Sequence, residues 1–283
     1  MVTKEATFPL EDELGDVLEK ALRRAGLTPE DVARRANVPL GKIRDAIDYR
    51  SDLGCDELRR IATVLRLNEV GLCALGTGRY PQPELGSLPF CVWPLRMPHG
   101  IGVANAYVVA ETGAERALLF DTGAGIRALA ASWPRSIRTL DAVFLTHVEP
   151  EHAGGLCDVV ERFGAPIAFV PQGATAPCGS DMRDQATHVF GGLGVTAFAT
   201  PGHAAAHNCY LITMAARPGA CALLISGDLL FAGSVGGAYF SHAQLQTSVS
   251  RMLRLVPAWT VIAPGHGPMT TAAHELRYNP FAS

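Results

Sequence analysis

The stretch of sequence that decides the fold is AVFLTHVEPEH, residues 142–152. Its first four residues are apolar and have the length of a short buried strand, and a polar loop follows them directly. Histidine and glutamate side chains then crowd into that loop at positions 147, 149, 151 and 152. Because rigid scaffolds hold chemically active groups in loops at the ends of strands, this loop is a candidate functional site.

The same design recurs at four other places outward from this stretch. Short apolar runs at residues 117–120, 195–199, 222–225 and 260–262 each lead into a polar loop. Those loops contain, in chain order, Asp121, His203, Asp228 and His266. A single loop histidine is more often an ordinary polar residue than a metal ligand, but five strand ends that all carry ligand types favour a metal site.

Composition restricts the class of protein. Hydrophobic residues make up 48% of the 283 residues and charged residues 18%, so a packed core is expected rather than disorder. The net charge of -3 provides no global basic field for nucleic acid. Seven cysteines without a Cys-x-x-Cys pair, an acidic start and the lack of a long apolar run indicate a cytoplasmic protein with reduced thiols and no membrane partner.

The chain changes character near residue 80. We predict a helical domain over residues 1–78, a Gly- and Pro-rich linker over 79–89 and a second domain over 90–283. In the first domain, apolar residues at helical spacing predict helices near residues 14–25, 29–36, 40–48, 58–65 and 72–75. Thr28 and Pro29 are typical of a helix start, and Gly26 of a helix end. The periodic positions suffice for a small core, so we expect this domain to fold independently of any metal.

Two short helices joined by a tight turn at residues 37–39 resemble the helix-turn-helix of Cro/repressor-type proteins. The resemblance implies DNA contacts from Lys42, Arg44 and Arg50, and a homodimer. Residues 1–79 carry 13 basic and 14 acidic side chains, however, so any DNA binding is expected to be weak and steeply salt-dependent. The alternative is a helical domain for dimerisation or for docking a partner.

The ordered series of loops in residues 90–283 resembles the metallo-β-lactamase fold superfamily, and the segments after residue 227 resemble glyoxalase-II-type hydrolases. The implied fold class is α/β: an αββα sandwich with two metals along one edge, preceded by the small all-α domain. The family's motif His-x-His-x-Asp-His reads here His147-Val148-Glu149-Pro150-Glu151-His152. Glutamate at the second ligand position is similar to the flavodiiron O2 and NO reductases and to related diiron proteins.

The resemblance assigns seven metal ligands. One metal would take His147, Glu149 and His203, the other would take Glu151, His152 and His266, and Asp228 would bridge them. Hard oxygen donors move a site from zinc toward iron or manganese, so two irons are favoured, with zinc or manganese as alternatives. Glu151 adds one methylene where the family has aspartate, and whether it reaches the second metal stays open.

Three further residues are assigned near this centre: Asp121 as a group that orders the ligand loops, and His207 and Tyr239 as pocket residues. The functional interpretation is a diiron protein that binds, senses or reduces O2 or NO, or that performs diiron oxidative chemistry. The 283 residues contain no flavodoxin-like segment, so no flavin is expected and electrons would come from a partner protein. The alternatives are a glyoxalase-II-like hydrolase of thioesters or esters and a transcription regulator with a non-catalytic metal site.

Overall fold

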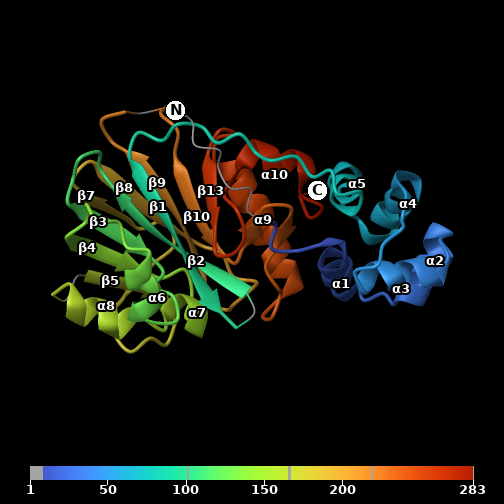
Figure 1. The fold of residues 1–283 in the computed structure, drawn as a ribbon, viewed down its shortest axis with the longest axis horizontal. Helices are drawn as coiled ribbons and strands as arrows, with labels where there is room; N and C mark the ends of the chain where they lie inside the picture. Colours follow the sequence, from blue (N-terminus) through green and yellow to red (C-terminus); the bar gives the residue numbers. More distant parts are fainter. Residues whose placement is uncertain (1–8, 101, 165–166, 218, 283) are drawn as a thin grey trace.

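The computed structural model describes residues 9–100, 102–164, 167–217 and 219–282. Its first part is a unit of helices (Figure 1). In chain order they are α1 (Leu14–Ala25), α2 (Pro29–Ala36), α3 (Leu40–Ile47), α4 (Cys55–Leu65) and α5 (Glu69–Gly76). The helices predicted from the sequence are confirmed, with ends displaced by a few residues at α3, α4 and α5.

The helix ends follow the sequence signals. The side chain of Thr28 accepts a hydrogen bond from the backbone N–H of Asp31, and Pro29 occupies the first turn of α2. Gly26 ends α1 in the left-handed conformation with φ 62°. Asn37 does the same for α2 with φ 50°, and this tight turn leads into α3. The connecting segment 79–88 contains neither helix nor strand.

Two mixed sheets form the centre of the second part. The described strands of the first sheet follow the order β1 (Cys91–His99), β2 (Gly102–Ala110), β3 (Arg116–Phe120), β4 (Thr139–Phe144), β5 (Ile167–Pro171), β6 (Ser180–Met182). Those of the second follow the order β14 (Thr270–Thr271), β13 (Val261–Pro264), β10 (Leu223–Gly227), β9 (Asn208–Met214), β8 (Leu193–Ala199), β7 (Thr187–Phe190). A short hairpin, β11 (Leu230–Phe231) and β12 (Ser234–Val235), lies beside the second sheet.

Helices cover the outer faces of both sheets, which gives the order of layers helix, sheet, sheet, helix. Between the sheets lies an aromatic core in which the Phe120 and Phe144 rings are 5.0 Å apart and Phe144 and Tyr210 are 5.3 Å apart. The first sheet carries α6 (Ile126–Ala131), α7 (Pro150–Ala153) and α8 (Leu156–Arg162) on its side; the second carries α9 (His242–Leu255) and α10 (Ala272–Tyr278).

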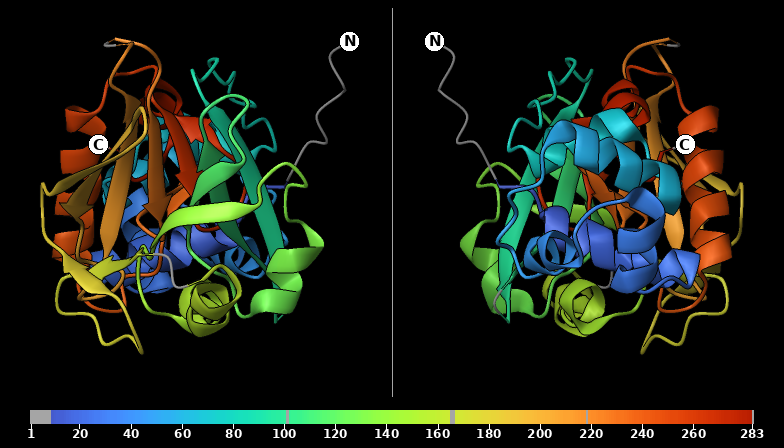
Figure 2. Two further views of the ribbon diagram at one scale, coloured as in Figure 1. Left: turned by 90° about the vertical axis from the view of Figure 1, so that its left-hand side faces the viewer. Right: turned by 90° about the vertical axis from the view of Figure 1, so that its right-hand side faces the viewer.

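The helical unit lies across the end of the sandwich, beside α9, α10 and the C-terminal residues (Figures 1 and 2). A single cluster of buried apolar side chains runs from Leu14 and Leu18 of α1 to Leu245 of α9 and Phe281. Polar contacts cross the same seam: Lys20 Nζ donates to the Val235 carbonyl oxygen over 2.7 Å. The two parts therefore share one core.

Among the described residues, every helix falls short of the length and apolar character needed to cross a bilayer.

Candidate metal centre

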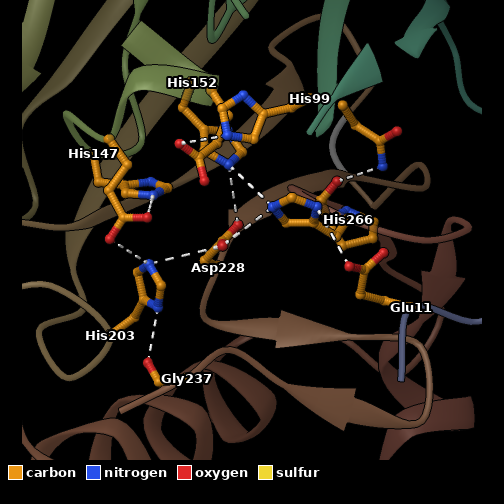
Figure 3. A network of polar contacts seen from close by, with 12 residues as sticks. Glu11, His99, His147, His152, His203, Asp228, Gly237 and His266 are labelled. Atoms are coloured by element: carbon orange, nitrogen blue, oxygen red, sulfur yellow. Dashed lines mark hydrogen bonds and ion pairs between the residues drawn. The ribbon is translucent and has the colours of Figure 1, made fainter. Parts of the chain in front are cut away.

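Five strand ends or loops of the two sheets converge at one edge of the sandwich, where their polar side chains face a common centre (Figure 3). The parallel pairing of β3 with β4, and of β10 with β13, brings the carboxyl ends of these strands to the same edge. From these ends come His147 after β4, His152 on α7, His203 after β8, Asp228 after β10 and His266 after β13.

Asp228 occupies the middle of the centre. Its Oδ1 lies 3.4 Å from His152 Nε2, and its Oδ2 lies 3.7 Å from His203 Nε2 and 3.4 Å from His266 Nε2. The two oxygens of one carboxylate thus face histidines from different loops. This is the arrangement that a carboxylate shared by two metal ions requires.

Glu149 approaches the same His203 nitrogen as Asp228. Its Oε1 is 3.2 Å from His203 Nε2, and its Oε2 is 3.9 Å from His147 Nε2. Two groups of ligand atoms lie within 4.8 Å of one another: His147 with His152 and Asp228, and His147 with Glu149 and His203. His147 belongs to both groups, so the two candidate positions are adjacent.

Each of the four histidines is oriented by a hydrogen-bond acceptor at Nδ1. For His147, His152, His203 and His266 these acceptors are, in turn, Thr146 Oγ1 at 2.9 Å, Asp121 Oδ2 at 3.1 Å, the Gly237 carbonyl at 2.8 Å and the Val103 carbonyl at 2.9 Å. Thr146 itself donates its hydroxyl proton to Asp121, so its oxygen is free to accept. The proton therefore resides on Nδ1 in each neutral ring, and every Nε2 lone pair faces the centre.

Several nitrogen and oxygen atoms of the centre are buried without a hydrogen-bond partner. Within the described part of the chain, His147 Nε2, His203 Nε2 and Asp228 Oδ1 are buried and make no hydrogen bond. Nearly all buried polar atoms in proteins have a partner, so orphaned atoms that face one another need an explanation. Imidazole nitrogens and carboxylate oxygens in this arrangement fit divalent metal ions.

The protonation states of three groups suit cation binding, whereas at His152 a metal would have to displace a proton, because against the effect of burial Asp228 and Asp121 raise the pKa of His152 to about 9. Although burial alone would raise it, the surrounding histidines, His152 above all, hold the pKa of the Asp228 carboxyl well below its usual range. The His203 imidazole, whose Nε2 lies 3.2 Å from Glu149 Oε1, lowers the pKa of Glu149. Burial and the neighbouring His152 depress the pKa of His147 well below its ordinary value. Two carboxylates and a neutral imidazole are the forms in which these side chains bind metals.

The remaining predicted residues occupy different surroundings. Glu151 points to His99, with its Oε2 3.7 Å from His99 Nε2, and it is in neither ligand group. Asp121 is buried and holds both the Thr146 backbone and the His152 ring. Tyr239 is 78% exposed, with its ring 5.3 Å from that of His203.

His207 supports Asp228 rather than offering a free nitrogen. Its buried Nε2 accepts a hydrogen bond from the Asp228 backbone N–H over 3.2 Å, and its Nδ1 lies 2.8 Å from Thr200 Oγ1. Gly227 precedes Asp228 with φ 48°, and a side chain there would overlap Thr146 and His207. Only glycine therefore lets the end of β10 pack so close to the histidines.

Glu11 is a neighbour of the centre that the sequence reasoning missed. Its Oε1 lies 3.7 Å from His266 Nδ1, and its backbone lies against Gly267 in the same loop (Figure 3). The segment that precedes α1 is held in place by Asp12, whose buried carboxylate contacts Lys20 and Ser234. No local pattern could assign Glu11, because it is more than 250 residues away in sequence from its neighbour His266.

The predicted DNA-contact residues form ion pairs. Their partners are Glu30 for Arg44 at 2.5 Å, Glu57 for Lys42 at 3.1 Å, and Asp45 and Asp48 for Arg50 at 3.0 and 3.1 Å. A DNA phosphate would have to compete with a carboxylate at each of these side chains. The weak, salt-dependent DNA binding expected from the balanced charge of the helical domain stays a prediction.

Comparison with protein families identifies the sandwich. The model of the metallo-beta-lactamase superfamily matches residues 99–266, which is more than half of the chain. This chain belongs to the metallo-beta-lactamase superfamily. The matched residues include all four histidines of the centre, Glu149 and Asp228, and they leave the helical unit outside.

Several members of the superfamily are similar over the same part. Probable metallo-hydrolase YqgX of Bacillus subtilis (strain 168) is 30% identical over 210 residues, covering 66% of this chain and 95% of that protein. The structure of BLEG-1 B3 metallo-beta-lactamase is 27% identical with a TM-score of 0.55, and TTHA1623 in a di-iron-bound form is 28% identical with a TM-score of 0.52. Each of these structures matches 66% of this chain and 98% of its own.

Proposed function

We propose that this protein is a metalloenzyme with two adjacent metal positions that prefer iron, and that it reacts with O2 or NO. The observation that carries the proposal is Glu149, whose carboxylate lies between His147 Nε2 and His203 Nε2. An anionic oxygen donor at this position favours iron or manganese over zinc. The similar protein TTHA1623, of known di-iron-bound form, supports the same preference.

The protein's own residues would divide the work as follows. His147, Glu149 and His203 would hold one metal, His152 and His266 the other, and Asp228 would be shared. A pair of ferrous ions, when bound, supplies electrons for reduction of the gas. Thr146, Asp121, Gly237 and Val103 keep the Nε2 atoms aimed at the metals. An electron-donor protein would complete the reaction.

A hydrolase is the second candidate, because the relative with 30% identity is described as a probable metallo-hydrolase. In that case the metals would activate water and polarise the carbonyl of a thioester or ester. Asp228 and the four histidines would have the same places, and Glu149 would be a tolerated substitution. The two proposals therefore differ in the role of one side chain.

The test is Glu149→His, compared with wild type expressed under identical supply of iron and zinc. We expect wild type to contain iron and to change its visible absorbance on exposure to O2 or NO. The variant should shift toward zinc, because a neutral nitrogen replaces an anionic oxygen. Metal analysis and absorbance spectra measure both effects.

Three results would contradict the iron proposal. Wild type and variant could take up the same metal, wild type could contain zinc alone, or wild type could fail to respond to either gas. Glu161→Asp serves as a control, since Glu161 is an exposed residue of α8 in neither ligand group and its substitution should leave the metal preference unchanged. Thioesterase turnover by zinc-loaded wild type would move the hydrolase to first place.

A further inference from the structure

Two hollows follow the seam between the helical unit and the sandwich. The larger, of about 690 Å³, lies between the ends of α1 and α4 and the start of α9. The smaller, of about 230 Å³, lies between α1, α9 and the loop of residues 235–239. Both are lined by Arg24, His242 and Gln246, so they form one groove, here called the seam groove.

The seam groove is basic in an acidic protein. Lys20, Arg23, Arg24, Arg35 and Arg66 line it, and no aspartate or glutamate is among the described residues that line either hollow. The chain as a whole carries a net charge of -3. The concentration of positive charge is therefore local. It comes from α1, α2 and the end of α4, whereas α9 contributes neutral residues to the lining.

Three of these cations lack a compensating charge. Lys20 is paired with Asp12, and Arg23 with Glu19 at 2.9 Å. Arg24, Arg35 and Arg66, by contrast, have no carboxylate partner among the described residues. Arg24 donates to Gln246 and to the Leu65 and Arg66 carbonyls, which are neutral groups.

Arg24 is also close to a second positive charge, that of Arg66. Burial, and then the neighbouring guanidinium of Arg66, lower the pKa of Arg24. Holding two guanidiniums together at the edge of a hollow is unfavourable unless an anion joins them. Guanidiniums bind phosphate oxygens in paired, directional hydrogen bonds, so a cluster of three suits a phosphate better than a single carboxylate.

The inner end of the groove borders the metal centre. The carbonyl oxygen of Gly237, in the wall of the smaller hollow, accepts the hydrogen bond from His203 Nδ1 over 2.8 Å. Tyr239 in the same wall has its ring 5.3 Å from that of His203. A molecule held by its anionic end among the arginines would thus extend toward the loop that orients a ligand.

We propose that the seam groove binds the phosphate group of a small organic molecule, with Arg24, Arg35 and Arg66 as the clamp. This proposal goes beyond the proposed function and does not rest on it, because O2 and NO carry no phosphate group. Nucleic acid is the less favoured occupant, because α3 contributes no residue to the lining of either hollow. The helical unit would then contribute the cations of this binding site.

Matched pairs of substitutions test the clamp. Arg35→Gln with Arg66→Gln removes two groove cations from α2 and the end of α4. Arg34→Gln with Arg59→Gln removes the same charge from the same two helices, but these arginines pair with Asp31 and Asp56 outside the groove. The three metal-loaded proteins are titrated with inorganic phosphate by calorimetry, and their metal content is measured alongside.

We expect the groove pair to weaken phosphate binding by about tenfold or more, since two charged hydrogen-bond donors are lost. The control pair should bind as wild type does, and all three should hold equal metal. Equal phosphate binding by both pairs, or none by wild type, would overturn the proposal. Loss of metal or of folding in the groove pair alone would show a structural role for these arginines instead, and would also count against it.

Two further arms separate the other occupants. Treatment with a chelator should leave phosphate binding intact; its loss would mean that phosphate binds the metals and would overturn the proposal. A short DNA duplex that displaces phosphate from wild type but not from the groove pair would make the groove a nucleic-acid contact, which also overturns it. Metal analysis tests the proposed function separately, so a zinc-containing protein that still binds phosphate in the groove would refute one proposal only.

Discussion

Asp121 links the segment of His147 to the His152 ring. Its carboxylate accepts hydrogen bonds from the Thr146 backbone N–H at 2.7 Å, from Thr146 Oγ1 at 2.8 Å and from His152 Nδ1 at 3.1 Å. Three donors converge on two oxygens, so only a carboxylate can satisfy them all. Its backbone lies in the left-handed region with φ 60°, which aspartate and asparagine tolerate better than other residues with side chains.

Asp121→Asn tests this role without changing the backbone preference. The amide would present N–H groups to a site that already contains three donors, so the His152 ring would lose its orientation. We expect metal affinity to fall by roughly 10- to 100-fold and unfolding free energy to fall by about 1–3 kcal/mol. Competition with a chelator and denaturant unfolding measure the two effects. Asp141→Asn is the control and should change neither, because Asp141 pairs with Arg116 on the surface. Unaltered metal affinity in Asp121→Asn would refute the role.

For single residues, the sequence was informative where a ligand-type side chain directly follows a strand. His147, His152, His203, Asp228 and His266 could be grouped because parallel strands end at one edge of a sheet. Of the acceptors at Nδ1, Asp121 was assigned as a group that orders the ligand loops, whereas the Gly237 and Val103 carbonyls carry no sequence signal. Glu11 was missed because its position depends on how the helical unit docks, which is a tertiary property.

At the scale of elements, α5 docks on the C-terminal segment through close backbone contact. The Asn68 N–H donates to the Pro280 carbonyl over 2.8 Å, and Asn68 Nδ2 donates to the Arg277 carbonyl over 3.0 Å. Gly71 lies so near this segment that a Cβ there would overlap the Tyr278 carbonyl oxygen. The helix could be predicted from periodicity, but its partner could not, because glycine in a helix has several possible causes.

Gly71→Ala should disturb this docking. Overpacking against a backbone that cannot move aside costs about 1–3 kcal/mol of unfolding free energy. Gly41→Ala is the matched control on α3, where a Cβ would have open space, and it should be neutral or stabilising by up to about 1 kcal/mol. Denaturant midpoints with a constant m-value measure the difference. Equal effects of the two substitutions would show that α5 does not rest on the C-terminal segment.

At the scale of the whole molecule, the composition and the packing predict different folding behaviour for the helical unit. The break near residue 80 and the separate helical periodicity predicted a domain that folds by itself. The structure instead continues one apolar cluster from Leu18 and Leu72 to Val249 and Phe281. Tyr80, in the connecting segment, is also fixed by a hydrogen bond from its hydroxyl to Glu275 of α10 over 3.1 Å. Sequence periodicity shows which side chains are buried, but not which element buries them.

The shared cluster predicts that both parts unfold together. All three tryptophans, Trp93, Trp133 and Trp259, lie in the sandwich, so their fluorescence reports on that part alone. The helical circular dichroism signal, by contrast, reports on α1–α5 as well as on the helices of the sandwich. In a single cooperative transition the two signals have the same denaturant midpoint.

Metal loading gives this prediction its strictest form. A ligand that binds only the folded state raises the midpoint of every part that unfolds with its site, so metal in the sandwich should stabilise α1–α5 as well. We therefore expect both signals to shift by the same amount when chelated protein is reloaded with metal. The helical unit would fold alone if part of the circular dichroism signal were lost at a lower denaturant concentration, and if the midpoint of that loss did not change when metal is added. Gly71→Ala weakens the seam while leaving every metal ligand in place. If docking holds the two units together, this variant should lose part of the helical signal before the tryptophan fluorescence changes.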